Sequence, residues 1–263
     1  MVDWTGLITN GVWAALGAGG AYFWRRCHRW WKSRGHGALF AGLGEPTLFV
    51  FPPRPGPGKL LPQTAIEDFL AINNIISAYI RIGMEPPHKM RDHHHFSPSS
   101  DGKNNNLILI CSSKSNNITE QAINQLRGRN SRWADLIPYF ESVPGKPDRI
   151  QIKWNQGTWE SPSYEQTGPR LDDVAIIIKA RNPWAEQHKI LIVAGIRGIG
   201  TWGAAEKLKK WWEDIYEKKG SSRRRGTSKQ GEFAAIVRIH YEDHDIKDAT
   251  LIDMVDLDCE YSR

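Results

Sequence analysis

Hydrophobic residues along the chain fall into short continuous runs that alternate with stretches of helical periodicity. Continuous apolar runs of this length predict strands that are buried on both faces of a sheet. These runs occupy residues 47–51, 106–111, 172–180 and 188–196. Further strands, shorter or with alternating polarity, are predicted at 88–92, 149–154, 232–241 and 250–261. We expect the last two of these to be antiparallel neighbours.

Three stretches have apolar residues at the spacing of one helix face. The predicted helices span 63–83, 116–126 and 202–219. Thr64 and Glu67 form the pattern of a capping box at the start of the first helix, and Gly83 follows its last apolar residue. Asn117 is the expected cap of the second helix. Strands that alternate with helices predict an α/β fold, with helices packed on a mixed sheet.

The first part of the chain has a different character. No charged residue occurs from Trp4 to Trp24, and a helix of that length, rising about 1.5 Å per residue, spans a hydrocarbon core of roughly 30 Å. The basic segment 25–34 follows directly, which predicts a cytoplasmic C-terminal side. We therefore expect a transmembrane helix at 1–24, a basic juxtamembrane linker at 25–46 and a cytoplasmic domain at 47–263. The residues expected at the membrane are Trp4, Trp13, Tyr22, Trp24, Arg25, Arg26 and Arg29.

Three other interpretations of this segment remain open. A secretory signal normally has basic residues before its apolar run, whereas Asp3 stands there. A soluble core helix is compatible with the glycines and with Asn10, which dilute the hydrophobicity. An amphipathic helix lying on the membrane would have its basic residues along one face instead of after the apolar run.

The small residues between 14 and 21 allow helices to approach closely in lipid, which predicts a homo-oligomer.

The charge and the cysteines restrict the function of the remaining chain. The net charge is +6, but the segment 25–34 holds five basic residues and no acid, so that 30 basic and 29 acidic residues remain outside it. This balance argues against direct nucleic-acid binding through bulk charge. The three cysteines stand far apart and form no C-x-x-C motif, which argues against a disulfide framework and a zinc ribbon.

Gly198, Gly200 and Gly203 form a G-x-G-x-x-G pattern between an apolar run and a helix. A dinucleotide-binding turn belongs in the first βαβ unit and needs an acid about 20 residues downstream, where this chain has arginines at 223–225. Two interpretations remain open. The glycines permit tight packing of strand against helix, or the helix N-terminus binds an anion or nucleotide together with Arg197.

A second loop of the same kind lies at 112–116, where hydroxyl groups and a lysine stand between a strand and a helix. It is not a Walker loop, and helix capping is the alternative to phosphate binding. Because ligands of open α/β sheets bind at the carboxyl ends of strands, we expect both loops to converge on one ligand. The expected ligand-binding residues are Arg54, Ser112, Ser113, Lys114, Ser115, Asn116, Gly195, Arg197, Gly198, Gly200 and Thr201.

Asp92 is followed by three histidines, which raises the question of a metal site. Alternate side chains of a strand point to opposite faces, so only His93 and His95 would share a face, with Asp92 opposite. A polar loop is the favoured interpretation, and we expect no metal and no cofactor. No catalytic constellation is evident either, although Cys111 ends a strand beside a helix N-terminus, where the pKa of a thiol is lowered.

The stretch "NLILICSSKSN" at 106–116, paired with "ILIVAGIRGIGTWGAA" at 190–205 and preceded by "FPPR" at 51–54, resembles a poorly characterised bacterial domain. That domain shows strand-G-P-K/R-x-(S/N) followed by strand-A-G-I-x-x-(I/V)-G-(T/S), and it occurs fused to other modules, membrane spans among them. Ser112 and Ser113 stand where Gly-Pro is usual. Over about 47–240 the resemblance implies a Rossmann-like three-layer sandwich with a mixed, mainly parallel sheet, and it implies no activity.

The layout is similar to that of bacterial antiviral effectors, which join a short membrane span to a Rossmann-like sensor of nucleotide second messengers. It implies a membrane-anchored effector that senses a nucleotide or phosphorylated ligand and perturbs the membrane through oligomerised spans. One alternative is a membrane-anchored nucleotide or NAD hydrolase that uses a carboxylate, with Glu160 and Glu165 as candidates. Another is an interaction module whose span tethers a partner protein.

Overall fold

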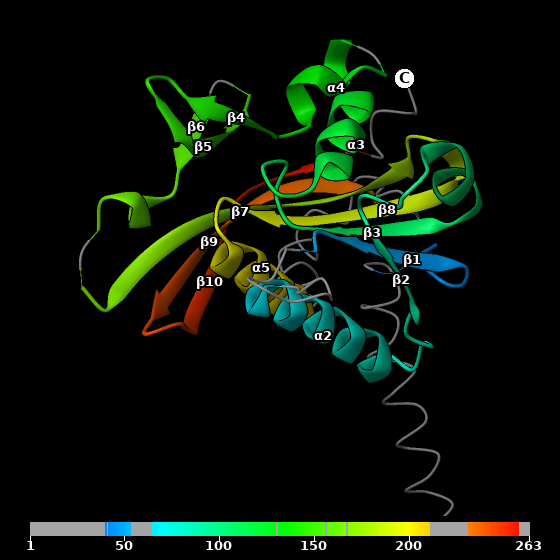
Figure 1. The fold of residues 1–263 in the computed structure, drawn as a ribbon, viewed down its shortest axis with the longest axis horizontal. Coiled ribbons are helices and arrows are strands. Elements are labelled where there is room, and N and C mark those ends of the chain that lie inside the picture. Colours follow the sequence, from blue (N-terminus) through cyan, green and yellow to red (C-terminus); the bar gives the residue numbers. More distant parts are fainter. Residues whose placement is uncertain are drawn as a thin grey trace, which may run out of the picture.

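The computed structural model describes residues 40, 42–53, 65–129, 131–155, 157–166, 168–210 and 231–257. Within them a seven-stranded sheet has the order β10-β9-β7-β8-β3-β1-β2 (Figure 1). Its strands are β1 (Thr47–Phe51), β2 (Lys89–Asp92), β3 (Asn106–Ile110), β7 (Arg170–Asn182), β8 (Ala185–Gly195), β9 (Phe233–Glu242) and β10 (Asp245–Asp256).

The sheet is mixed. Strands β2, β1, β3 and β8 form a parallel block. The remaining pairs, β8 with β7, β7 with β9 and β9 with β10, are antiparallel, so β9 runs in the same direction as the parallel block. The predicted antiparallel pairing of the last two strands is confirmed, as is the α/β class.

Helices cover both faces of this sheet, because its central strands are apolar on both sides. On one face, α2 (Ile66–Arg81) and α5 (Gly198–Lys210) pack against strand residues such as Ile177 and Leu191. On the other face, α3 (Asn117–Arg127) and α4 (Ser131–Leu136) pack against residues such as Ile176 and Ile192. Figure 1 shows the two helix layers on opposite sides of the sheet. Burial of each such aliphatic side chain contributes about 1.5–3 kcal/mol.

A second, three-stranded antiparallel sheet lies between α4 and β7 in the sequence. It consists of β4 (Tyr139–Val143), β5 (Lys146–Trp154) and β6 (Gly157–Glu160), followed by the 3₁₀ helix η2 (Pro162–Tyr164). Its apolar side chains, such as Ile152 and Trp154, join the same core as α3. A π-helical turn, η1 (Pro98–Gly102), connects β2 to β3.

Some predicted boundaries are wrong. The sequence pattern predicts no regular element at 157–166, and the structure has β6 and η2 there. The helix expected to begin at 202 begins at Gly198, so two glycines of the G-x-G-x-x-G pattern lie inside its first turn. The cap of α3 is Asn116 and not Asn117, because the Asn116 side chain accepts a hydrogen bond from the amide of Ile118.

Several predictions concern residues outside the described part of the chain. They include the transmembrane helix at 1–24 with all its interface residues, most of the basic linker and Arg54. The predicted cap of the first helix is wrong, because the N-cap residue of α2 is Ala65 and not Thr64. Within the described residues, no helix combines the length and the apolar character needed to cross a bilayer.

Candidate functional site

A pocket of about 520 Å³ opens at the carboxyl ends of β3 and β8, a volume typical of small-molecule sites. The two strands are parallel neighbours, so the loops that follow them leave the sheet at the same edge. One loop leads into α3 on one face of the sheet and the other leads into α5 on the opposite face. The two connections therefore diverge to opposite faces of the sheet at this point. Ligands of open α/β sheets usually bind in the crevice formed at such a position.

Residues of both predicted loops line this pocket. They are Ser112, Lys114 and Ser115 from the first loop and Arg197 and Gly198 from the second. The structure thus brings together two segments that stand about 80 positions apart in the sequence. Their side chains lie in one cavity wall, whereas their contact with a ligand stays a prediction.

The other predicted ligand residues with a described position do not line the pocket. Asn116 is fully buried, and its amide group donates to the carbonyl oxygens of Ile110 (3.0 Å) and Val50 (3.4 Å). Thr201 is also fully buried, and its Oγ1 accepts a hydrogen bond from the amide of Gly195 at 2.9 Å. These side chains hold the backbone of the two loops. Ser113, Gly195 and Gly200 are also absent from the lining residues.

The glycines of the second loop are required by close packing. A Cβ atom on Gly195 would lie 2.3 Å from the amide nitrogen of Thr201, and one on Gly200 would lie 2.3 Å from Asp173 Oδ2. A Cβ atom on Gly203 would lie 2.5 Å from Ile239 Cγ2 on β9. Each of these distances is far below any contact that a side chain tolerates. The pattern therefore reflects a tight strand-to-helix turn.

The same turn directs Arg197 and the first turn of α5 toward the pocket. The first amides of a helix have no partner within the helix and attract anions. The backbone of Arg197 is fixed by Asp173, whose Oδ2 accepts its amide hydrogen at 3.0 Å. Its guanidinium donates from Nη1 to Ser163 Oγ at 3.1 Å. A guanidinium has five donors, so this contact leaves others for an anion.

Asp173 lies beneath this arrangement, fully buried on β7. Burial raises the pKa of its carboxyl group to about 6, opposed by hydrogen bonds from Ser161 and from the amides of Val174 and Arg197, and by the charge of Arg197. A carboxylate held in this way fixes the position of the loop and does not itself line the pocket.

The pocket wall combines charges of both signs with aromatic surface. Lys114 and Arg197 supply positive charge, and Glu67 and Asp148 supply carboxylates. The ammonium group of Lys114 donates to the backbone carbonyl of Asp148, which joins the first loop to β5.

Tyr164 and Tyr241 supply aromatic surface, next to the apolar side chains of Leu171, Ile196 and Ile199. Burial raises the pKa of Tyr164 above the usual value of a phenol. A wall that combines aromatic and apolar groups with cations is suited to a ligand with a ring and a phosphate.

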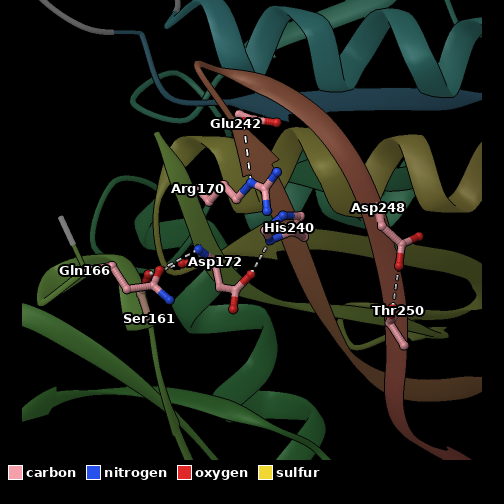
Figure 2. Close-up of polar contacts among 8 residues, drawn as sticks. All are labelled: Ser161, Gln166, Arg170, Asp172, His240, Glu242, Asp248 and Thr250. Carbon is pink, nitrogen blue, oxygen red and sulfur yellow. Dashed lines mark hydrogen bonds and ion pairs between the residues drawn. The ribbon is translucent and has the colours of Figure 1, made fainter. Parts of the chain in front are cut away.

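The segment that carries Tyr164 is bound along β7. Ser161 Oγ donates to the carbonyl of Asp172 at 3.4 Å, and the amide of Asp172 donates to Gln166 Oε1 at 2.7 Å. Figure 2 shows these contacts, with the Asp172 carboxylate directed at His240 of β9, whose Nδ1 lies 2.8 Å from Asp172 Oδ1. Both ends of the segment are thus fixed, which holds Tyr164 in the pocket wall.

The two carboxylates proposed from the sequence for a hydrolase lie outside the pocket. Neither Glu160 nor Glu165 lines the pocket. Glu165 is exposed and pairs with Arg149 (3.0 Å) and Lys146 (3.2 Å), and the hydrogen bonds and charges of these two cations lower its pKa. The carboxylates that line the cavity are Glu67, for which the sequence predicts only a capping role, and Asp148, for which it predicts none.

Comparison with known protein families and with curated proteins finds no match to this chain.

Proposed function

We propose that the pocket binds a nucleotide or another phosphorylated small molecule. The observation that carries the proposal is the convergence of the Ser112–Ser115 loop and the Arg197 turn in one cavity. Phosphate oxygens would accept hydrogen bonds from Arg197, from Lys114 and from the first amides of α5. The tyrosines and apolar side chains of the same wall suit a base or a sugar.

We further propose that this Rossmann-like domain is the sensor of a membrane-anchored effector that acts in bacterial antiviral defence. This part rests on the sequence alone, namely on the uncharged segment 4–24 and the basic residues after it. A ligand changes an oligomer only by binding one arrangement more tightly than another. The proposed effector therefore perturbs the membrane when ligand binding favours one packing of its spans over another.

The first test is thermal unfolding of the full chain in mild detergent, against ATP, NAD, dinucleotides and cyclic oligonucleotides. A ligand at 100 times its dissociation constant adds about 2.7 kcal/mol, which corresponds to roughly 5–10 °C for a domain of this size. Arg197→Ala and Lys114→Ala are expected to abolish the shift. Lys89→Ala, an exposed cation at the start of β2, should preserve it. If the shift survives in both pocket variants, or no compound produces one, the proposed site is wrong.

A hydrolase is the second candidate, because Glu67 and Asp148 line the same cavity. A carboxylate near a bound nucleotide or NAD is able to act as a general base. Chromatography of the stabilising compound after incubation separates the two functions. An enzyme is identified if the wild-type chain forms product and Glu67→Gln or Asp148→Asn forms none while keeping the thermal shift. A sensor is identified if the wild-type chain leaves the compound unchanged. A chain that binds no member of the panel would instead fit the interaction module that tethers a partner protein.

A further inference from the structure

A second polar cluster lies at the carboxyl end of β2, and none of its residues lines the pocket described above. Asp92 is the last residue of this strand, and His93 and His94 follow in a turn. The amide of His93 donates to the carbonyl of Phe51 at 3.1 Å, which fixes the turn against the end of β1. The cluster therefore lies at the edge of the sheet, beside the end of β1.

The two histidines direct the same ring atom at each other. Their Nε2 atoms lie 3.0 Å apart, and the rings meet nearly edge to face, with centroids at 4.0 Å. One ligand atom from each of Asp92, His93 and His94 can be chosen so that all lie within 4.8 Å of one another. Nitrogen ligands on one tetrahedral zinc ion, each at about 2.0–2.1 Å, are separated by about 3.3 Å. The contact between the two Nε2 atoms is a hydrogen bond in the metal-free chain, and its length is close to the spacing of two nitrogen ligands on one ion.

The turn explains why adjacent histidines converge. The sequence pattern pairs His93 with His95, because it treats the segment as a continuous strand with alternating faces. The chain leaves the strand after Asp92, which brings His93 and His94 to the same side. His95 instead contacts Asp92, with its Nδ1 at 3.0 Å from Oδ2.

The carboxylate is oriented by its neighbours. Asp92 Oδ1 accepts the amide hydrogen of His94 at 2.7 Å, and Oδ2 faces His95. Hydrogen bonds of this kind commonly orient metal-binding carboxylates. His93 is 8% exposed, whereas His94 is exposed. One ligand is thus anchored in the protein and the other faces solvent, which leaves an entry path for an ion and room for a water ligand.

We propose that Asp92, His93 and His94 bind one divalent transition-metal cation of the Zn²⁺ class. Two imidazoles and one carboxylate favour such borderline ions over Mg²⁺ and Ca²⁺, which prefer oxygen ligands. The three protein ligands leave at least one coordination position for water or a substrate oxygen. This proposal stands on its own geometry and does not depend on the nucleotide pocket.

The test uses the full chain with its affinity tag removed and its metals stripped by a chelator. After equilibration with Zn²⁺ in competition with a chromophoric chelator, we expect one zinc per chain by elemental analysis. His94→Ala should reduce the affinity at least about tenfold. Because it also removes the hydrogen-bond partner of the buried His93, thermal unfolding of the metal-free variant is measured beside it to establish that the variant is folded. His88→Ala removes another exposed histidine just before β2 and serves as the matched control, with affinity unchanged.

Co²⁺ provides a second measurement, since its visible absorption reports nitrogen and oxygen ligands directly. The cobalt spectrum is expected in the wild-type chain and in His88→Ala, and it should be lost or altered in His93→Ala and His94→Ala. Mg²⁺ in excess should not displace the metal. Substoichiometric zinc in the wild-type chain, or equal zinc affinity in wild type and His94→Ala, would overturn the proposal.

Discussion

At the scale of single residues, the buried carboxylate of Asp173 links the folded core to the pocket. Its Oδ2 receives the amide of Arg197 and lies against Gly200, where no side chain fits. The contact fixes the turn that presents Arg197, but burial removes the carboxylate from water and so disfavours its charged form. The pKa of Asp173 is therefore raised from 3.8 to about 6.

This raised pKa makes stability depend on pH in a direction opposite to that of a salt-bridged acid. Between pH 3.8 and 6 the folded state binds more protons at Asp173 than the unfolded state does, so stability falls as the pH rises through this window. A difference of about two pKa units corresponds to about 3 kcal/mol. In urea titrations, the free energy of unfolding of Asp173→Asn minus that of wild type should therefore increase by about 3 kcal/mol from pH 3.5 to 7.

Glu165→Gln is the comparison variant. Ion pairs with Arg149 and Lys146 lower the pKa of Glu165, so its contribution to stability is present above its unfolded pKa and is lost as the pH falls. The corresponding difference should therefore change in the opposite sense. A difference for Asp173→Asn that stays constant over the whole pH range would show that Asp173 keeps an ordinary pKa.

At the scale of elements, Asn116 joins three of them. Its side chain caps α3 through the amide of Ile118 and donates to the last residue of β3 and to Val50 of β1. Asn116→Ala removes the cap and leaves two buried carbonyl groups without this donor, at a cost of about 2–3 kcal/mol. Asn116→Asp keeps the cap acceptor but directs a charge at those carbonyls. Thermal unfolding should rank both below wild type, whereas Asn117→Ala, an exposed neighbour, should unfold like wild type.

An Asn116→Ala chain as stable as wild type would show that water replaces these hydrogen bonds. The thermal shift that a ligand produces in Asn116→Ala is a second measurement. Because Asn116 is buried and absent from the pocket wall, its substitution should weaken ligand binding only through the loop.

The elements differ in how well the sequence predicts them. Runs such as 47–51 and 106–111 are apolar on both faces, and the structure has strands there with almost the same bounds. The sequence pattern misses the start of α5, because the glycines at 198 and 200 disfavour a helix. Glycine is required at 200 by the close approach of Asp173, a contact that the sequence does not reveal. Tyr164 is missed for a similar reason, since hydrogen bonds to β7 and not a local pattern hold its segment.

At the scale of the whole molecule, the pocket is a product of topology. Its wall takes residues from the start of α2, the loop after β3, the inserted three-stranded sheet, η2, the α5 turn and the β9–β10 hairpin. The expected convergence of two loops follows from a general property of parallel strands. The contributions of Asp148, Tyr241 and His244 have no counterpart in the sequence pattern, because strand order and register place them.

This composite wall predicts a distinctive pattern of hydrogen exchange. With the compound that gives the largest thermal shift, amide exchange should slow together in 111–116, 162–166, 196–200 and 241–245, since one ligand contacts all four segments. At 100 times the dissociation constant the protection reaches about 100-fold for amides that exchange only from the unbound state. The edge strand at 89–92 should be unaffected, because it contributes no residue to the wall. Protection confined to a single segment would indicate a surface contact of the compound, and protection absent from 196–200 would exclude Arg197 as its partner.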